Sequence, residues 1–298
     1  MDQNVIEGVG VGFRDSHFDD ILEEDHNIQW FELLTENHLV EESIPFYKAE
    51  KIRENYPMTL HGVGMSLGST DPLNLNYMKK LSTLINRLDP ARVSDHLAWV
   101  SHNGVYSHEL LPLPYTEETL KHLTTRINQA QDILGRTILI ENPSSYLSFT
   151  HSEMREDEFL IQLMTSTGCD LLLDINNLYV SAINLKFDPL VYLKTLVPSR
   201  VKEIHLAGYE IQTKTNPLNG SYTQLLFDTH GHPVRQPVWQ LYEKALSLFG
   251  QIPTLMEWDT NIPSFQDLAL EASKAQSKMD QGMPLYDKTE SLLTVFNR

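Results

Sequence analysis

Short apolar runs alternate with longer amphipathic segments along most of the chain. Eight of the apolar runs have the length expected of buried strands, and they cover residues 9–13, 28–34, 58–63, 92–100, 137–142, 170–176, 201–208 and 254–259. Nearly continuous apolar runs are typical of strands that are covered on both faces of a parallel sheet. The alternation therefore predicts a series of βα units.

The segments between these runs carry helix start and stop signals. Helical spacing is found in residues 71–89, 116–135, 152–168 and 234–250. Asp71 and Pro72 are predicted to open the first of them, as N-cap and first-turn residues. Thr116 is a predicted N-cap of the second, and Gly135 is a predicted C-terminal stop.

Eight strands that are each followed by a helical segment match the count that closes a TIM (β/α)8 barrel, an α/β fold. A doubly wound open sheet is the structural alternative, since sequence does not show closure. We expect one barrel domain over residues 1–279. Residues 280–298 depart from the alternation and are expected to form an extra helix or a tail.

The amino-acid composition limits the classes of partner that the protein is expected to bind. The 23 Lys and Arg residues against 40 Asp and Glu residues give a net charge of −17, which opposes binding to nucleic acid or to an anionic membrane. No apolar stretch has the length of a membrane span, and the N-terminus lacks a signal-peptide pattern, so a soluble cytoplasmic protein is expected. Cys169 is the one cysteine, which excludes an intramolecular disulfide and a thiolate zinc cluster. It precedes the sixth strand and is expected to be a buried structural thiol.

The carboxyl ends of the strands carry the candidate chemistry, because TIM-barrel active sites gather there. Six consecutive predicted strands end in a side chain that suits metal binding or acid–base chemistry: His61, His96, Glu141, Asp174, His205 and Glu257. The loop after the seventh strand adds Asp228, His230 and His232. Each residue alone is also compatible with a structural role, such as a hydrogen-bonded core histidine or, for Asp174, a helix cap.

The joint pattern favours metal. Carboxylates and imidazoles crowded at one barrel mouth would suffer desolvation and mutual repulsion unless a cation neutralised them. The donor set suits iron, manganese or zinc, and it exceeds the three or four ligands that one ion usually takes from a protein. Two or three ions are therefore expected.

The same segments resemble a known family. The motifs LHGVGMSLGS, VSDHLAWV, ILIENPSSYL, LLLDINNLYVSAIN, EIHLAG, DTHG and MEWD are similar, in order, to those of the domain-of-unknown-function 692 (UPF0276-type) family, from about residue 8 to about residue 275. That family includes the iron-binding subunit of the methanobactin biosynthesis complex. The resemblance implies a xylose isomerase-like TIM barrel that holds two or three iron ions, for which other divalent metals could substitute. It also implies dioxygen-dependent modification of a cysteine, or another residue, in a ribosomally made precursor peptide, commonly with a separate peptide-recruiting partner protein.

The resemblance also implies roles for individual residues. His61, His96 and Glu141 would bind one iron, and Glu141 would bridge to a second that Asp174, His205 and Glu257 complete. Asp228 and His230 would bind a third ion, and Glu141 and Asp174 are expected to be catalytic. Glu36, Asn37 and Asn177 are candidates for contacts behind the metal ligands or to substrate, with solvated loop or turn positions as their plainer interpretation.

Other functions stay open at the level of sequence. A divalent-metal sugar isomerase or epimerase would use the same barrel and ligand types. A trinuclear hydrolase of the endonuclease IV type would also do so, although the net charge and the lack of a loop rich in Lys and Arg oppose a DNA-facing surface. An inactive member that acts as an interaction protein is a further alternative, which the intact set of ligand-type residues disfavours.

Overall fold

The computed structural model describes residues 4–23, 26–215 and 222–281. Its centre is a closed barrel of parallel strands in the order β1-β12-β9-β8-β7-β4-β3-β2. The bounds of these strands are Val9–Gly12 (β1), Phe31–Leu34 (β2), Met58–Gly62 (β3), Arg92–His96 (β4), Leu139–Glu141 (β7), Asp170–Asp174 (β8), Val201–Leu206 (β9) and Thr254–Met256 (β12). The predicted TIM barrel is confirmed, and the open-sheet alternative is excluded.

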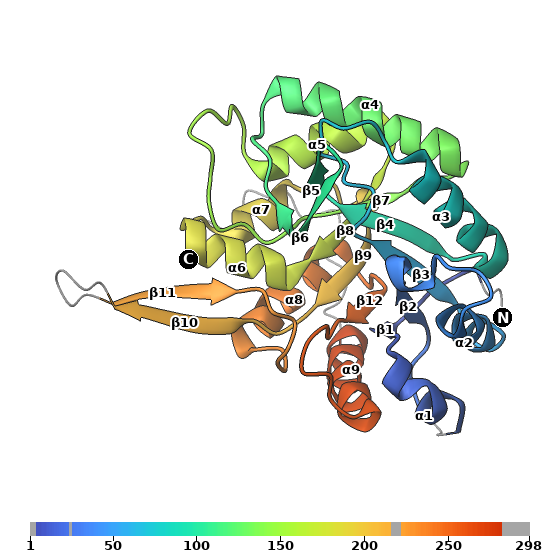
Figure 1. Ribbon diagram of the computed structural model, residues 1–298. Helices are drawn as coiled ribbons and strands as arrows, with labels where there is room; N and C mark the ends of the chain where they lie inside the picture. The colour runs from blue at the N-terminus through green and yellow to red at the C-terminus, as the bar shows by residue number, and fades with distance from the viewer. Residues whose placement is uncertain (1–3, 24–25, 216–221, 282–298) are drawn as a thin grey trace.

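Helices surround the barrel (Figure 1). They are α1 (Phe18–Glu23), α2 (Ile44–Arg53), α3 (Leu75–Leu88), α4 (Glu117–Leu134), α5 (Glu156–Thr167), α6 (Ile175–Leu185), α7 (Pro189–Thr195), α8 (Gln236–Phe249) and α9 (Phe265–Asp280). Short 3-10 turns lie at Asp15–His17, Thr35–His38 and Pro198–Arg200. Within the described residues, none of the helices is both long and apolar enough to cross a bilayer.

Helix α4 begins and ends where the sequence predicts. The Thr116 side chain accepts the backbone N–H of Thr119, and Gly135 takes the left-handed conformation with φ of 65°. The predicted start of the preceding helix at Asp71 is wrong. Asn74 caps α3 instead. The Asp71 carboxylate accepts hydrogen bonds from the N–H groups of Asn103 and Gly104, in the turn between β5 and β6, and is therefore not free to cap a helix.

Two antiparallel hairpins interrupt the βα alternation. One pairs β5 (Trp99–His102) with β6 (Val105–Leu111), so the predicted strand 92–100 ends at His96 and its remainder leaves the barrel. The other pairs β10 (Glu210–Thr215) with β11 (Tyr222–Phe227) and projects from the barrel (Figure 1). The sequence pattern predicted neither hairpin.

Strand register places polar side chains at one level of the barrel. His96 is the register partner of Glu141 on the neighbouring strand, and Asp174 is the partner of His205. Since all barrel strands are parallel, their carboxyl ends form one rim. The rim therefore brings together residues that lie far apart in sequence.

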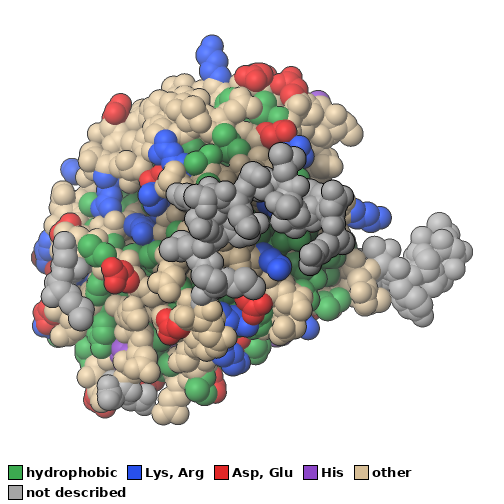
Figure 2. All heavy atoms as spheres, turned by 180° about the vertical axis from the view of Figure 1, so that it is seen from behind, with side chains coloured by type: hydrophobic (Ala, Val, Ile, Leu, Met, Phe, Trp, Pro, Cys, Tyr) green, Lys and Arg blue, Asp and Glu red, His purple; other side chains and the backbone are tan. Residues whose placement is uncertain are grey.

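The prediction of a separate C-terminal segment at 280–298 falls almost wholly outside the described residues and stays a prediction. Within the described part, α9 packs against β1 and β12 and so belongs to the barrel unit. On the face seen in Figure 2, Lys and Arg side chains are scattered among acidic ones, with no single basic patch on the described surface there.

Candidate metal centre

A first buried group joins two histidines and one carboxylate from neighbouring strands. Glu141 Oε2 lies 3.0 Å from His61 Nε2 and 3.1 Å from His96 Nε2, and the two nitrogens lie 3.3 Å apart. All three side chains are buried, and they form one of the groups that could hold a metal ion. The structure thus brings together the three residues expected to share an ion.

Hydrogen bonds on the far side of each imidazole decide which nitrogen carries a lone pair. His96 Nδ1 lies 3.1 Å from the Gly62 carbonyl, which accepts only, so Nδ1 carries the proton and Nε2 the lone pair. His61 Nδ1 lies 2.8 Å from Ser94 Oγ, whose own hydroxyl faces the Leu60 carbonyl at 3.4 Å. The same tautomer is favoured for His61. Two imidazole lone pairs and a carboxylate oxygen then converge on one point, which is the arrangement of a cation site.

A proton is the alternative occupant of that point. Burial disfavours charge on both His61 and Glu141, but their ion pair raises the pKa of His61 to about 10 and, with His96, lowers the pKa of Glu141 to about 2. Burial lowers the pKa of His96, so this imidazole stays neutral. A metal ion therefore has to displace one proton, chiefly from His61.

A second group shares Glu141 and adds Asp174, His205 and Glu257. His205 Nδ1 lies 3.1 Å from Glu257 Oε2. Asp174 Oδ1 accepts the N–H of Asn177 as the N-cap of α6, while Asp174 Oδ2 is buried without a hydrogen-bond partner among the described residues. Burial, together with the charges of Glu141, Asp228 and Glu257, raises the pKa of Asp174. An orphaned carboxylate oxygen in this position fits a metal ligand.

Asn177 braces the second group. Its Nδ2 donates to Glu141 Oε1 and to the Asn142 carbonyl, both at 3.2 Å. Asn142 in turn exchanges hydrogen bonds with the backbone of Asp174. These contacts orient Glu141 toward both groups, and the role of Asn177 behind metal ligands stays a prediction.

A third group that could hold an ion, on the side of the β11–α8 loop, consists of His230, Glu257 and Asp259. The predicted ligand Asp228 is outside this group and faces the other ring nitrogen of His230. His230 Nε2 is 2.5 Å from Asp228 Oδ1, and His230 Nδ1 is 3.3 Å from Glu257 and 3.0 Å from Asp259. Burial opposes a charge on His230, but Asp228 and Glu257 raise its pKa. His230 has φ of 43°, a left-handed conformation that is uncommon outside glycine. The loop is thus bent to turn this imidazole toward Glu257.

Sequence reasoning missed carboxylates inside the barrel. Glu32 Oε1 lies 3.3 Å and Glu203 Oε1 lies 3.9 Å from His205 Nε2, and these three residues form a further group that could hold an ion. Burial and the charge of Glu32 raise the pKa of Glu203 to about 7. The period-2 alternation of β9 was the available signal, since Glu203 and His205 point to the same face. The same reasoning missed Asp259, which belongs to the third group.

Three other candidates lie outside these groups. Glu36 Oε1 accepts the N–H of Val63 and the hydroxyl of Tyr77, so Glu36 braces the loop after β3. Asn37 is exposed on the turn after β2. His232 is partly exposed and takes part in none of the groups formed by the described residues.

Together, the fold and these groups define a xylose isomerase-like TIM barrel with candidate metal-binding side chains at its mouth. The family model described as "RiPP precursor modification enzyme MbnB/TglH/ChrH" matches residues 8–280. The chain belongs to this family of enzymes, which confirms the family expected from the sequence motifs.

Curated relatives and solved structures agree with the assignment. A UPF0276 protein of Acaryochloris marina is 51% identical over 279 residues, covering 94% of this chain and 97% of the relative. A UPF0276 protein of Anaeromyxobacter sp. is 46% identical over 90% of this chain and 91% of the relative. Endonuclease IV of Thermus thermophilus superposes with a TM-score of 0.59 at 13% identity, over 92% of this chain and 99% of that one. D-psicose 3-epimerase of Clostridium cellulolyticum superposes with a TM-score of 0.58 at 12% sequence identity, over 92% of this chain and 99% of that one. Such low identities establish the fold alone.

Proposed function

We propose that this protein is a cytoplasmic, multinuclear iron-dependent enzyme that uses dioxygen to modify a residue, a cysteine in the first instance, of a ribosomally made precursor peptide. The family assignment supports a peptide substrate. The observation that supports a metal ion is the convergence of His61 Nε2, His96 Nε2 and Glu141 Oε2 within 3.3 Å, at a point where an ion would replace the proton that His61 and Glu141 otherwise share. A separate peptide-recruiting partner protein belongs to the proposal.

The donor set fits two or three ions. His61, His96 and Glu141 would hold the first, and Asp174, His205 and Glu257, with Glu141 as the bridge, would hold the second. Asp228 and His230 would hold a third, with Asp259 behind His230. Imidazole and carboxylate donors suit iron, and other divalent metals could substitute.

The chain's own residues have distinct tasks in this proposal. Iron, when bound, supplies the redox chemistry with dioxygen. Asn177 and Asn142 orient Glu141 and Asp174, the two carboxylates proposed as catalytic. The Gly62 carbonyl and Ser94 hydroxyl hold the two imidazoles in the ligating tautomer. The buried walls keep bulk water from the donor atoms, which strengthens their electrostatic effect.

The test combines metal analysis with mass spectrometry of a peptide substrate. Protein expressed with iron is incubated with a cysteine-bearing precursor peptide and the partner protein, in air and under argon. We expect modification in air only, and we expect Glu141→Gln to lose at least one iron and the modification while it remains folded. Modification under argon would reject the oxidative chemistry. Turnover of a sugar under argon with Mn²⁺ would favour the isomerase alternative.

A further inference from the structure

A cavity lies between the β7–α5 loop and the helices α6 and α7, and none of its lining residues belongs to the candidate metal-binding groups. Its volume is about 400 Å³, in the range of small-molecule sites. Most of the lining is apolar or aromatic and includes Leu113, Leu147, Phe149, Met154, Phe187 and Val191. Leu147, Phe187 and Val191 are exposed apolar side chains, so hydrophobic surface is left open to solvent at this site.

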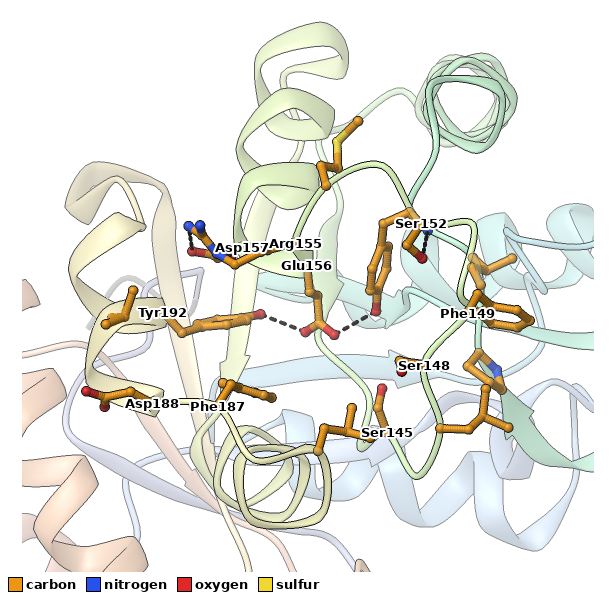
Figure 3. Close-up of a pocket in the computed structure, with 17 residues that line it drawn as sticks. Ser145, Ser148, Phe149, Ser152, Arg155, Glu156, Asp157, Phe187, Asp188 and Tyr192 are labelled. Atoms are coloured by element: carbon orange, nitrogen blue, oxygen red, sulfur yellow. Dashed lines mark hydrogen bonds and ion pairs between the residues drawn. The ribbon is translucent and has the colours of Figure 1, made fainter.

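A carboxylate lies at the centre of this apolar lining. Figure 3 shows Glu156 with its carboxylate facing the hydroxyl of Tyr192. The Tyr115 hydroxyl donates to Glu156 Oε2 at 2.6 Å, and the Tyr192 hydroxyl donates to Glu156 Oε1 at 2.8 Å. Two neutral hydroxyls satisfy part of the hydrogen-bonding capacity of a carboxylate but none of its charge.

Arg155, the cation among the lining residues, is already paired with carboxylates. Arg155 is bound to Asp157 through Nε and Nη2 and to Glu158 through Nη1. The lining also contains Asp188, so carboxylates outnumber cations around the cavity. Burial, together with the charge of Asp157, raises the pKa of Glu156, so the ionised carboxylate is disfavoured as long as no cation pairs with it. A ligand that supplied a positive charge would relieve this penalty.

We propose that this cavity binds an alkylammonium group, with the charged nitrogen at Glu156 and the alkyl chain against the apolar lining. The charge-assisted hydrogen bond to the carboxylate would favour a cation over a neutral group. A neutral alkyl group would leave the carboxylate uncompensated, and an anion would be repelled. The proposal does not depend on the metal centre or on the proposed reaction.

Binding can be measured on the metal-loaded protein by ligand-observed NMR titration. The probes are n-butylamine, n-butanol and butyrate, which differ in charge at similar size. We expect n-butylamine to bind about tenfold more tightly than n-butanol, because both can donate a hydrogen bond to the carboxylate but only the ammonium group also compensates its charge, and butyrate to bind least. Equal binding of the amine and the alcohol would overturn the proposal.

Two short peptides identify where the ammonium group comes from. Acetyl-Gly-Lys-Gly-amide carries it on a lysine side chain, and the same peptide with norleucine in place of lysine lacks the charge. Tighter binding of the lysine peptide than of n-butylamine would assign the cavity to a peptide side chain. The reverse order would assign it to a free amine, and both orders support the alkylammonium chemistry.

Variants separate this cavity from non-specific attraction to an acidic protein. Glu156→Gln keeps the size of the side chain and is expected to abolish the preference for amine over alcohol. Glu243→Gln on α8 removes the same charge outside the cavity lining, where Glu243 pairs with Lys278, and should leave that preference unchanged. If Glu156→Gln does not fold, Leu147→Trp at the exposed part of the lining serves instead and should weaken binding of every probe. A preference for amine that survives in folded Glu156→Gln, or unchanged binding in Leu147→Trp, would contradict the proposal.

Discussion

His205 is held between two sets of carboxylates, and this makes it the residue that joins the barrel interior to its mouth. Its Nδ1 faces Glu257, whereas its Nε2 faces Glu32 and Glu203 deeper in the barrel. Burial opposes a charge on His205, but the surrounding carboxylates raise its pKa. A carboxylate behind a ligating imidazole fixes the ring and increases its basicity. Glu32 is therefore expected to matter for metal binding although it lies below the rim.

Glu32→Gln should lower metal affinity by about 10- to 100-fold while the barrel remains folded, because the imidazole loses the anion behind it. Equilibrium dialysis against a metal buffer measures the affinity, and circular dichroism checks the fold. Glu271→Gln is the matched control, since Glu271 is a buried carboxylate on α9 that bonds Val234 N–H and Lys274 instead of a metal-binding group. Equal metal affinity in Glu32→Gln and the parent would contradict the role.

Cys169 should be chemically inert in the folded protein. Burial raises the pKa of its thiol to about 11, so almost no thiolate exists near neutral pH. We expect a thiol-specific disulfide reagent at pH 8 to label Cys169 only after denaturation. Rapid labelling of the native protein would show that the thiol is accessible and ionised, and it would reopen a role in the chemistry.

Sequence predicted the residues at the rim but not those beneath it, and the reason is geometric. Strand ends can be recognised because an apolar run stops there, and parallel strands bring such ends together, as for His96 and Glu141. Glu32 and Glu203 lie within their strands, where a charged residue interrupts the apolar pattern and gives no signal of a site. Their proximity to His205 depends on barrel closure and register, which one sequence does not reveal.

At the scale of elements, the end of β9 and the loop that carries His230 are packed backbone to backbone. A Cβ added at Gly208 would lie 2.0 Å from the carbonyl oxygen of His232 and 2.7 Å from that of Pro233. Both atoms belong to the backbone, so the clash could not be relieved by a side-chain rotation. Gly208 thus allows the approach that places His230 beside Glu257. The sequence shows this glycine in EIHLAG, but only the fold shows why no side chain fits.

Gly208→Ala is expected to displace the loop, reduce metal content by the ion assigned to Asp228 and His230, and destabilise the protein by about 1–3 kcal/mol through overpacking. Gly135→Ala is the control, because a Cβ at Gly135 meets nothing within 4 Å and only the left-handed φ is strained. It should cost about 1 kcal/mol and leave metal content unchanged. Metal analysis and denaturant unfolding measure both effects, and full metal content in Gly208→Ala would contradict the packing argument.

At the scale of the whole molecule, the candidate metal-binding groups link most of the barrel. Ligand candidates come from β3, β4, β7, β8 and β9 and from the residue that follows β12. Ions bound there would neutralise charges that otherwise repel one another in the core. Metal should therefore stabilise the fold as a whole and not only the mouth of the barrel.

Protein purified without chelators should contain at least two metal ions per chain, chiefly iron when iron is supplied. Removing them with a chelator should lower the melting temperature, and free metal at 100 times its Kd should restore about 2.7 kcal/mol per site at which the ion binds only the folded chain. Calorimetry with metal analysis checks this. Metal-free protein from iron-rich expression, with an unchanged melting temperature after iron addition, would refute the multinuclear centre.

The order of the strands around the barrel also sets an order in time. His61, His96 and Glu141 lie on β3, β4 and β7, which are neighbours in the sheet and come from the first half of the chain. Glu257 follows β12, which pairs with both β9 and β1 and so joins the last strand to the first. During synthesis, the residues proposed to bind the first ion emerge together in the N-terminal half, whereas the sites proposed to include Glu257 exist only after the ring of strands has closed. Binding of the later ions would therefore show that the barrel has finished folding.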